Sequence, residues 1–275
     1  MSDEAIDRDA IKARFIAERG YWRPWTDALL RDNPRFLDRY AAYAGHPARV
    51  GPLSAKQVEL VYVALDASST HLFAAGLGTH MEKALAAGAS PREISDVLHL
   101  VAAQGLDSVY QAVAILADEQ ARAAPCAGGA HEDATAFESP SGSPSLDEPL
   151  RARIERLDLA ASEPALSLLN ELDPGYLPVL LDFLEHGRPD DGLADVDRLL
   201  IEVALFACFT GHDPQALRQR IRAALADGSS AAALLQAIQL GAHLSVHGTA
   251  LGADTLAALL ARPAHDPSES RTSMP

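Results

Sequence analysis

Cysteine is nearly absent from this 275-residue sequence, which contains only Cys126 and Cys208. Two cysteines cannot build a disulfide framework or a four-cysteine zinc site, and a reducing compartment fits them. Aromatic residues make up only 5% of the sequence. Alanine and leucine supply most of its 48% hydrophobic content, and because both are strong helix formers the composition favours helices.

Positive charge is also scarce, with 23 lysines and arginines against 38 aspartates and glutamates and a net charge of −15. Nucleic acids and anionic membrane surfaces bind basic patches, so neither is an expected partner. No uninterrupted apolar run approaches the length of a membrane span. The acidic N-terminus has no apolar segment of the signal-peptide kind, so we expect no signal peptide and a cytoplasmic location.

The sequence repeats itself when residue i is laid against residue i+140. His46 then falls on His186, and LVYVALDASST from Leu60 falls on LIEVALFACFT from Leu200. Common alanines and leucines explain part of this match, but they do not explain the shared histidine. Two copies are too few for a solenoid, so we interpret the chain as one domain duplicated in tandem.

The repeat divides the chain into two helical domains, residues 1–120 and residues 148–261. Residues 121–147 between them are rich in Gly, Pro, Ser and Ala and lack periodicity, which predicts a flexible linker. A similar composition over residues 262–275 predicts a disordered tail. We expect five or six helices in each copy, packed within and between the copies as a pseudo-dimer.

Local signals place the helices of the first copy. Ser54 with Gln57, and Ser90 with Glu93, form capping boxes that begin two helices. Gly88 suits the left-handed end of the helix that runs through residue 85. No stretch combines two-residue alternation with the turn residues of a β-hairpin, so the predicted fold class is all-α.

The helix that begins after Ser54 holds the ionisable residues of greatest interest. It is apolar on nearly every face, which predicts burial, yet it contains Glu59 and Asp66. These carboxylates are seven residues apart and share one helix face, which Thr70 would rejoin if the helix persists. A carboxyl group in an apolar setting must be paired or protonated, and a raised pKa suits proton transfer.

The second copy lacks these ionisable residues. The replacements are Glu59 by Leu199, Asp66 by Phe206, Ser69 by Phe209, His71 by Gly211 and His80 by Arg220. We infer that the first copy carries the working site and that the second is mainly structural. The alternatives are that Glu59 lies at the surface, that Asp66 caps a neighbouring helix and that His71 is an ordinary core histidine.

His243 and His247 are four residues apart on a predicted helix and share a face, a spacing that can hold a metal ion. The sequence offers no third ligand, so we predict no metal site. His247 and Asp107 occupy equivalent positions in the two copies. We expect that they could instead line a pocket where the copies meet.

The segment from Leu53 to Gly105 resembles the carboxymuconolactone decarboxylase family, which includes the alkylhydroperoxidase D group. The resemblance consists of Glu59 opening an alanine-rich helix, His80 eight residues before Gly88, and the Gly-Ala-Ser-x-x-Glu-Ile turn that ends at Ile94. It implies a pair of such helical domains in each chain, with sites between subunits. A homo-oligomer is implied as well, and we favour a trimer of duplicated chains.

The family's peroxidase members use a C-x-x-C pair between the glutamate and the histidine, where this sequence has no cysteine. That redox chemistry needs a thiolate, so a thiol peroxidase is disfavoured. The resemblance instead implies a lyase or isomerase, without a cofactor, that acts on a small carboxylated or lactone-type metabolite. The alternative is a non-catalytic small-molecule-binding or assembly module that kept the fold.

Each candidate residue has a predicted role. His80 and His71 are the candidate acid and base, and Glu59 orients or tunes a histidine. The candidate substrate-binding residues are Asp66, Ser69, Thr70 and His247.

Overall fold

A computed structural model describes residues 6–123, 146–157 and 159–261 of the chain. Fourteen α-helices and two short 3₁₀ turns are present, and the described part contains no β-strand. The all-α prediction is therefore confirmed. Each half has seven α-helices rather than the five or six expected, because two helices precede α3, which begins at Pro34, and two precede α10. The second half was expected to begin the equivalent helix at Pro174, but α10 begins at Tyr176.

The first half contains α1 (Arg8–Arg19), α2 (Pro24–Asp32), α3 (Pro34–Arg49), α4 (Ala55–Ala67), α5 (Ala74–Ala86), α6 (Pro91–Ala103) and α7 (Leu106–Ala123). The second half contains α8 (Glu148–Arg156), η1 (Ala160–Ser162), α9 (Glu163–Leu172), α10 (Tyr176–His186), α11 (Asp195–Ala207), α12 (Pro214–Ala226), α13 (Ala231–Ala242), η2 (His243–Ser245) and α14 (Val246–Leu260). The first residues of α4 to α7 and of α11 to α14 are each 140 positions apart.

The capping signals act where the sequence placed them. The Ser54 side chain accepts a hydrogen bond from the Gln57 amide, and the Gln57 side chain accepts one from the Ser54 amide. Ser90 and Glu93 make the same reciprocal pair at the start of α6. Gly88, with a φ of 91°, ends α5 in the left-handed region that glycine tolerates best.

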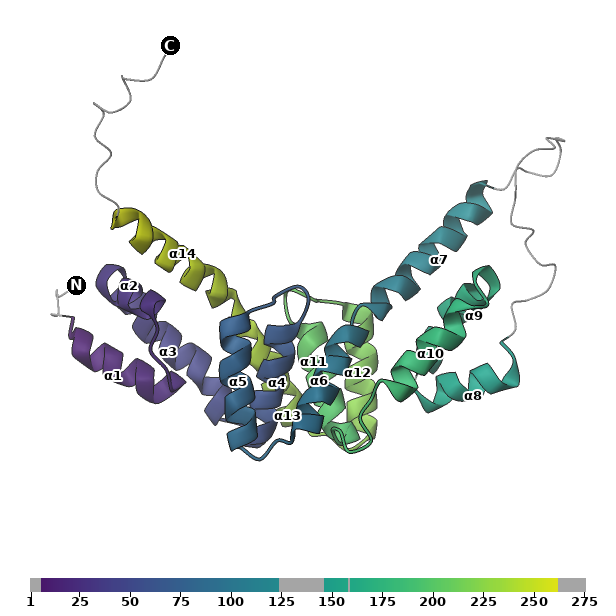
Figure 1. Ribbon diagram of the computed structural model, residues 1–275, viewed down its shortest axis with the longest axis horizontal. Helices are drawn as coiled ribbons and strands as arrows, with labels where there is room; N and C mark the ends of the chain where they lie inside the picture. Colours follow the sequence, from purple (N-terminus) through teal and green to yellow (C-terminus); the bar gives the residue numbers. More distant parts are fainter. Residues whose placement is uncertain (1–5, 124–145, 158, 262–275) are drawn as a thin grey trace, which may run out of the picture.

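The centre of the molecule is formed by α4 to α6 and α11 to α13 (Figure 1). The largest core cluster joins these helices, and α4 packs directly on α11 and α13. Every residue of α4 from Leu60 to Asp66 is buried. The prediction that this helix is buried is therefore confirmed, and its carboxylates must be accommodated inside the protein.

The last helix of each half packs on the other half. In Figure 1, α14 lies beside α1 to α3 at one end of the molecule, and α7 lies beside α8 to α10 at the other. Val246 and Ala250 of α14 join the core cluster around Phe15 and Trp25. Tyr110 of α7 joins the cluster that includes α9 and α10. Each outer bundle is therefore built from both halves of the chain.

A buried carboxylate connects α6 to the second half. Asp96 is 0% exposed and its Oδ2 accepts a hydrogen bond of 2.8 Å from the Leu193 amide. Its other oxygen pairs with Arg198, and Arg188 lies 3.4 Å away. Paired in this way, the buried charge is compensated and fixes α6 against the start of α11.

Gln236 of α13 joins the two halves by a second polar connection. It is 2% exposed, and its amide nitrogen donates to the Pro47 carbonyl at 2.8 Å. Its carbonyl oxygen accepts from the Leu53 amide, also at 2.8 Å. One side chain thus satisfies two backbone groups in the connection between α3 and α4.

The stretch Pro91–Glu119 is the one part of the described chain that is long and apolar enough to cross a membrane, judged by length and composition alone. It spans α6, the turn at Gln104 and Gly105, and most of α7. The predicted linker starts at residue 121, but α7 continues to Ala123. Residues 124–145 of that linker, with Cys126, and the predicted tail lie outside the described residues.

Replacing Gln236 with leucine is expected to lower the free energy of unfolding by about 1–3 kcal/mol, because two buried backbone groups lose their partners. Urea denaturation measures this loss. Gln215→Leu, at an exposed position of α12, is the matched control and is expected to change stability by less than about 0.5 kcal/mol. Equal effects of the two substitutions would contradict the bridging role.

Candidate active site

A histidine and a glutamate form a close pair between α4 and α5. The Nδ1 atom of His80 lies 2.6 Å from Oε2 of Glu59, and their side chains are only 14% and 16% exposed. The His80 ring packs against Tyr62 with ring centroids 4.5 Å apart. The sequence prediction that Glu59 orients a histidine agrees with this contact.

Burial lowers the pKa of His80, and the hydrogen bond that His80 donates to Glu59 only partly opposes that effect. The imidazole is therefore neutral near pH 7. Since a carboxylate can only accept, the proton of the neutral ring is assigned to Nδ1. The lone pair is then on Nε2, which makes no hydrogen bond to another described residue. This is the form of histidine that takes up a proton.

Asp66 is an almost fully buried carboxyl group without a hydrogen-bond donor. It is 1% exposed, and neither of its carboxylate oxygens has a partner among the described residues. Burial raises its pKa to about 7, against the opposing effect of Arg23 and Arg19. A Cβ atom at Gly76 would collide with Oδ2, so glycine there lets α5 approach the carboxyl group. Asp66 can thus exchange a proton near neutral pH.

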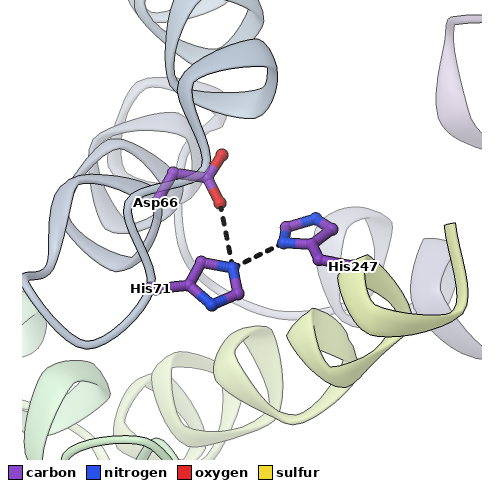
Figure 2. A group of neighbouring side chains, drawn as sticks. All are labelled: Asp66, His71 and His247. Carbon is purple, nitrogen blue, oxygen red and sulfur yellow. Dashed lines mark hydrogen bonds and ion pairs between the residues drawn. The ribbon is translucent and has the colours of Figure 1, made fainter. Parts of the chain in front are cut away.

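Two histidines from distant parts of the chain meet beside Asp66, as Figure 2 shows. The Nε2 atom of His71 lies 2.5 Å from Nδ1 of His247 and 3.9 Å from Oδ1 of Asp66. His247 is on α14 and stacks on Phe73 with ring centroids 3.7 Å apart. Burial lowers the pKa of both histidines, and His71 also helps lower that of His247 to about 3. Both rings are neutral at physiological pH.

The turn that presents His71 has an uncommon backbone conformation. The next residue, Leu72, has a φ of 48°, and it is the one non-glycine residue with positive φ among those described. Its side chain is 70% exposed, so it gains little from packing. Left-handed backbone at a leucine costs free energy and is concentrated at functional sites. This turn therefore supports a functional role for His71.

The same three residues could hold a metal ion. One donor atom from each of Asp66, His71 and His247 lies within 4.8 Å of the other two. Two neutral imidazoles and one carboxylate suit Zn²⁺ or Fe²⁺. The sequence suggested His243 with His247 as metal ligands but offered no third metal ligand. In the structure, Nε2 of His243 instead faces the Arg19 guanidinium at 3.3 Å, so that nitrogen is the acceptor of this hydrogen bond.

The site includes residues that were not predicted from the sequence, among them Arg19, Arg23 and Tyr62. They line one small cavity together with Asp66, His80, His243 and His247, and His243 had been considered only as a metal ligand. The cavity volume is about 20 Å³, which is room for about one water molecule. Substrate entry therefore requires movement of its walls. The two arginines come from α1 and the start of α2, which no motif connects with α4.

The structure brings most of the predicted site residues together. Glu59, Asp66, His71, His80 and His247 are neighbours around α4 and α14. Ser69 and Thr70 do not join them. The helix ends at Ala67, so both residues lie in an exposed turn, and Thr70 faces Ser68 instead. The prediction that Thr70 shares the face of Glu59 is wrong because the helix does not persist.

The second half contains an ion pair that the position-by-position comparison did not reveal. Glu202 lies 3.4 Å from Nε of Arg220. Arg220 occupies the position equivalent to His80, while Glu202 is equivalent to Tyr62 and is therefore three residues beyond the position of Glu59. Residues three apart share a helix face, so a carboxylate on α11 still pairs with the residue equivalent to His80, although that residue is now a cation.

The fold and site define an all-α protein in which a partly buried glutamate and histidine pair across two central helices. Residues 34–119 match the carboxymuconolactone decarboxylase family. The matching segment runs from α3 into α7. A comparison with curated proteins gives no match.

One solved structure extends the similarity over nearly the whole chain. It is a protein of Burkholderia xenovorans LB400, named as a candidate gamma-carboxymuconolactone decarboxylase subunit. The two sequences are 27% identical, and the structures superpose with a TM-score of 0.79. The match covers 94% of this chain and 98% of that one, so it includes both halves.

The raised pKa of Asp66 makes stability depend on pH. Its ordinary value is 3.8 and its value in the folded protein is about 7, so only the folded state holds this proton between the two. Its contribution to stability is therefore present at low pH and is lost as the pH rises to about 7.

Asp66→Asn removes that dependence. The free energy of unfolding of the variant minus that of the unchanged protein is expected to increase by about 3 kcal/mol when the pH is raised from 5 to 8. Urea denaturation at the two pH values measures this gain. Asp190→Asn, at an exposed position, is the control and should show no gain. A pH-independent difference for Asp66→Asn would refute the buried proton.

Proposed function

We propose that the first half carries the active site of a cofactor-free lyase that decarboxylates a small carboxylated or lactone-type metabolite. The match of residues 34–119 to the family and the similarity to the Burkholderia structure support a decarboxylase-like lyase in general terms. The observation that carries the specific proposal is the Glu59–His80 pair beside the buried Asp66. Together they offer a neutral imidazole that can act as a base and a carboxyl group whose pKa is raised to about 7.

His80 is the proposed general base. Its Nδ1–H is directed to Glu59, which fixes the ring and leaves the Nε2 lone pair for the substrate. When Nε2 takes up a proton, the imidazolium is stabilised by the Glu59 carboxylate, because opposite charges then lie within hydrogen-bond distance. The same proton can be returned to carbon later in the reaction.

The decarboxylation step needs an electron sink within the substrate. The bond between the substrate carbon and its carboxylate breaks, carbon dioxide leaves, and the electron pair enters a conjugated carbonyl group. The resulting dienolate is then protonated on carbon by Asp66, whose pKa of about 7 lets it carry a proton, or by His80 after its Nε2 has taken up a proton from water. Arg19 and Arg23 line the cavity and are the proposed donors for the substrate's anionic oxygens.

His71 and His247 complete the proposed site on the α14 side. Either neutral ring can donate a hydrogen bond to a substrate carbonyl, and His71 is the proposed second acid–base residue. Isomerisation, in which a proton moves from one carbon to another, uses the same groups. A thiol mechanism is disfavoured, because Cys208 is 5% exposed and lies on the second half rather than between Glu59 and His80.

One observation favours the alternative of a non-catalytic binding module. The cavity between Asp66 and His80 holds about 20 Å³, which is too small for a metabolite. An enzyme must open this cavity during each turnover, and a module that only kept the fold need not. Measurement of turnover separates the two functions.

His80→Gln is expected to reduce kcat by about a hundredfold or more, since the general base is removed. Gamma-carboxymuconolactone, the compound in the neighbour's name, is the first substrate to test, with carbon dioxide release as the readout. Glu59→Gln should reduce kcat less and shift the limb of the pH profile that reports His80.

The matched control is His212→Gln, which alters an exposed histidine in the equivalent loop of the second half. Its kcat should be unchanged. If the His80 and His71 glutamine variants both retain full turnover, the assignment of acid–base residues is wrong.

Removal of metal ions tests the prediction that the reaction uses no cofactor. Dialysis against a chelator is expected to leave kcat unchanged, because His80 and Asp66 supply the protons. The test is demanding here, since Asp66, His71 and His247 form a plausible donor set. Loss of turnover that is restored by Zn²⁺ or Fe²⁺, and not restored in His247→Ala, would assign these residues to a catalytic metal.

A further inference from the structure

A second, much larger cavity lies at the other end of the molecule from the candidate active site. It is bounded by the α6–α7 connection, by α8 and α10, and by α11 and α12, and its volume is about 690 Å³. Cavities of this size accommodate drug-sized ligands. We call it the second pocket.

The second pocket is the counterpart of the candidate active site. Arg220 and Glu202 line it, and they stand 140 residues after His80 and Tyr62. Asp107, which lines it from α7, stands 140 residues before His247 of α14. Each cavity is therefore completed by the last helix of the opposite half, as the equivalence of Asp107 and His247 suggested.

Arg220 has spare binding capacity. Its side chain is 14% exposed, its guanidinium lies 5.8 Å from the Phe206 ring centroid, and its Nε has no hydrogen-bond partner among the described residues. The ion pair with Glu202, at 3.4 Å, is longer than a normal hydrogen bond. A buried guanidinium with an unused N–H group favours a second anionic partner.

The other arginines of the second pocket are already engaged. Arg198 pairs with Asp96, and Arg156 donates to Glu185 at 3.0 Å. Arg188 pairs with Asp195 at 3.1 Å. Because the pocket also contains four carboxyl groups, a multiply charged anion such as a phosphate would be repelled. A single negative charge is the favoured complement to Arg220.

Apolar side chains line another part of the wall, beside polar residues that include Gln104 and His186. Leu159, Leu184, Leu199 and Phe206 line the pocket, with Tyr110 contributed by α7. We propose that the second pocket binds a small monocarboxylic acid with an apolar body, whose carboxylate lies on Arg220 and whose body packs on these leucines and Phe206. The proposal does not depend on the reaction proposed for the first half.

Isothermal titration calorimetry of the full chain tests this site with octanoate and benzoate as probes and with octanamide as the uncharged analogue of octanoate. Both acids are expected to bind, and octanamide more weakly than octanoate. Arg220→Gln should weaken octanoate binding by about tenfold to a hundredfold, because a charge-assisted hydrogen bond is lost. The same substitution should leave octanamide binding nearly unchanged.

Ala103→Phe is a second test, since it fills the second pocket from the end of α6 and should abolish binding of all three probes. Circular dichroism spectra and melting curves check that each variant is folded. Arg92→Gln, at an exposed site on α6, and His80→Gln, in the other cavity, are controls expected to bind octanoate normally.

Three results would overturn the proposal. One is the absence of saturable binding for both acids at millimolar concentration. Another is octanamide binding as tightly as octanoate, which would leave only an apolar cavity. The third is octanoate affinity that is lost in His80→Gln and retained in folded Arg220→Gln and Ala103→Phe, which would place the ligand in the candidate active site.

Discussion

The packing of each half's last helix on the opposite half is the arrangement on which both cavities depend. α14 brings His247 to the first half, and α7 brings Asp107 to the second. Without α14, α4 and α5 would not enclose a cavity. Without α7, the same holds for α11 and α12. The polar connections made by Asp96 and Gln236 hold the two halves in the register that this exchange requires.

The two cavities solve one electrostatic problem in different ways. An ionisable group between the central helices needs a partner, because an isolated buried charge is costly. The first half uses a neutral imidazole whose proton is held by Glu59. The second uses a permanent cation, Arg220, beside Glu202. A titratable pair suits proton transfer, whereas a permanently charged pair suits binding.

Much of the fold could be predicted from the sequence because its signals are local. Capping boxes and the glycine after α5 depend on residues a few positions apart, and burial of α4 follows from its composition. The Glu59–His80 pair was predictable through the family resemblance. The extent of α4 was not, since Ser68 to Thr70 suit both a helix and a turn.

Other features of the site depend on packing between distant segments. Arg19 and Arg23 reach the site only because α1 and α2 pack beside α14, and no sequence spacing indicates that contact. The Glu202–Arg220 pair was missed because a position-by-position comparison treats Leu199 as the loss of Glu59. Residues three apart share a helix face, so a carboxylate one turn later can make the same kind of contact. A helix face can therefore keep a carboxylate even when the aligned position has lost it.

The crossed placement of α7 and α14 also bears on how such a chain can diverge. A substitution in the last helix of one half alters the chemistry of the cavity centred on the other half. His247 and Asp107 are the example. His247 belongs to the second repeat but lines the cavity of the first half, and Asp107 belongs to the first repeat but lines the cavity of the second half. The chemistry of each cavity is therefore determined by residues from both repeats. For this reason neither repeat can be replaced as an independent module.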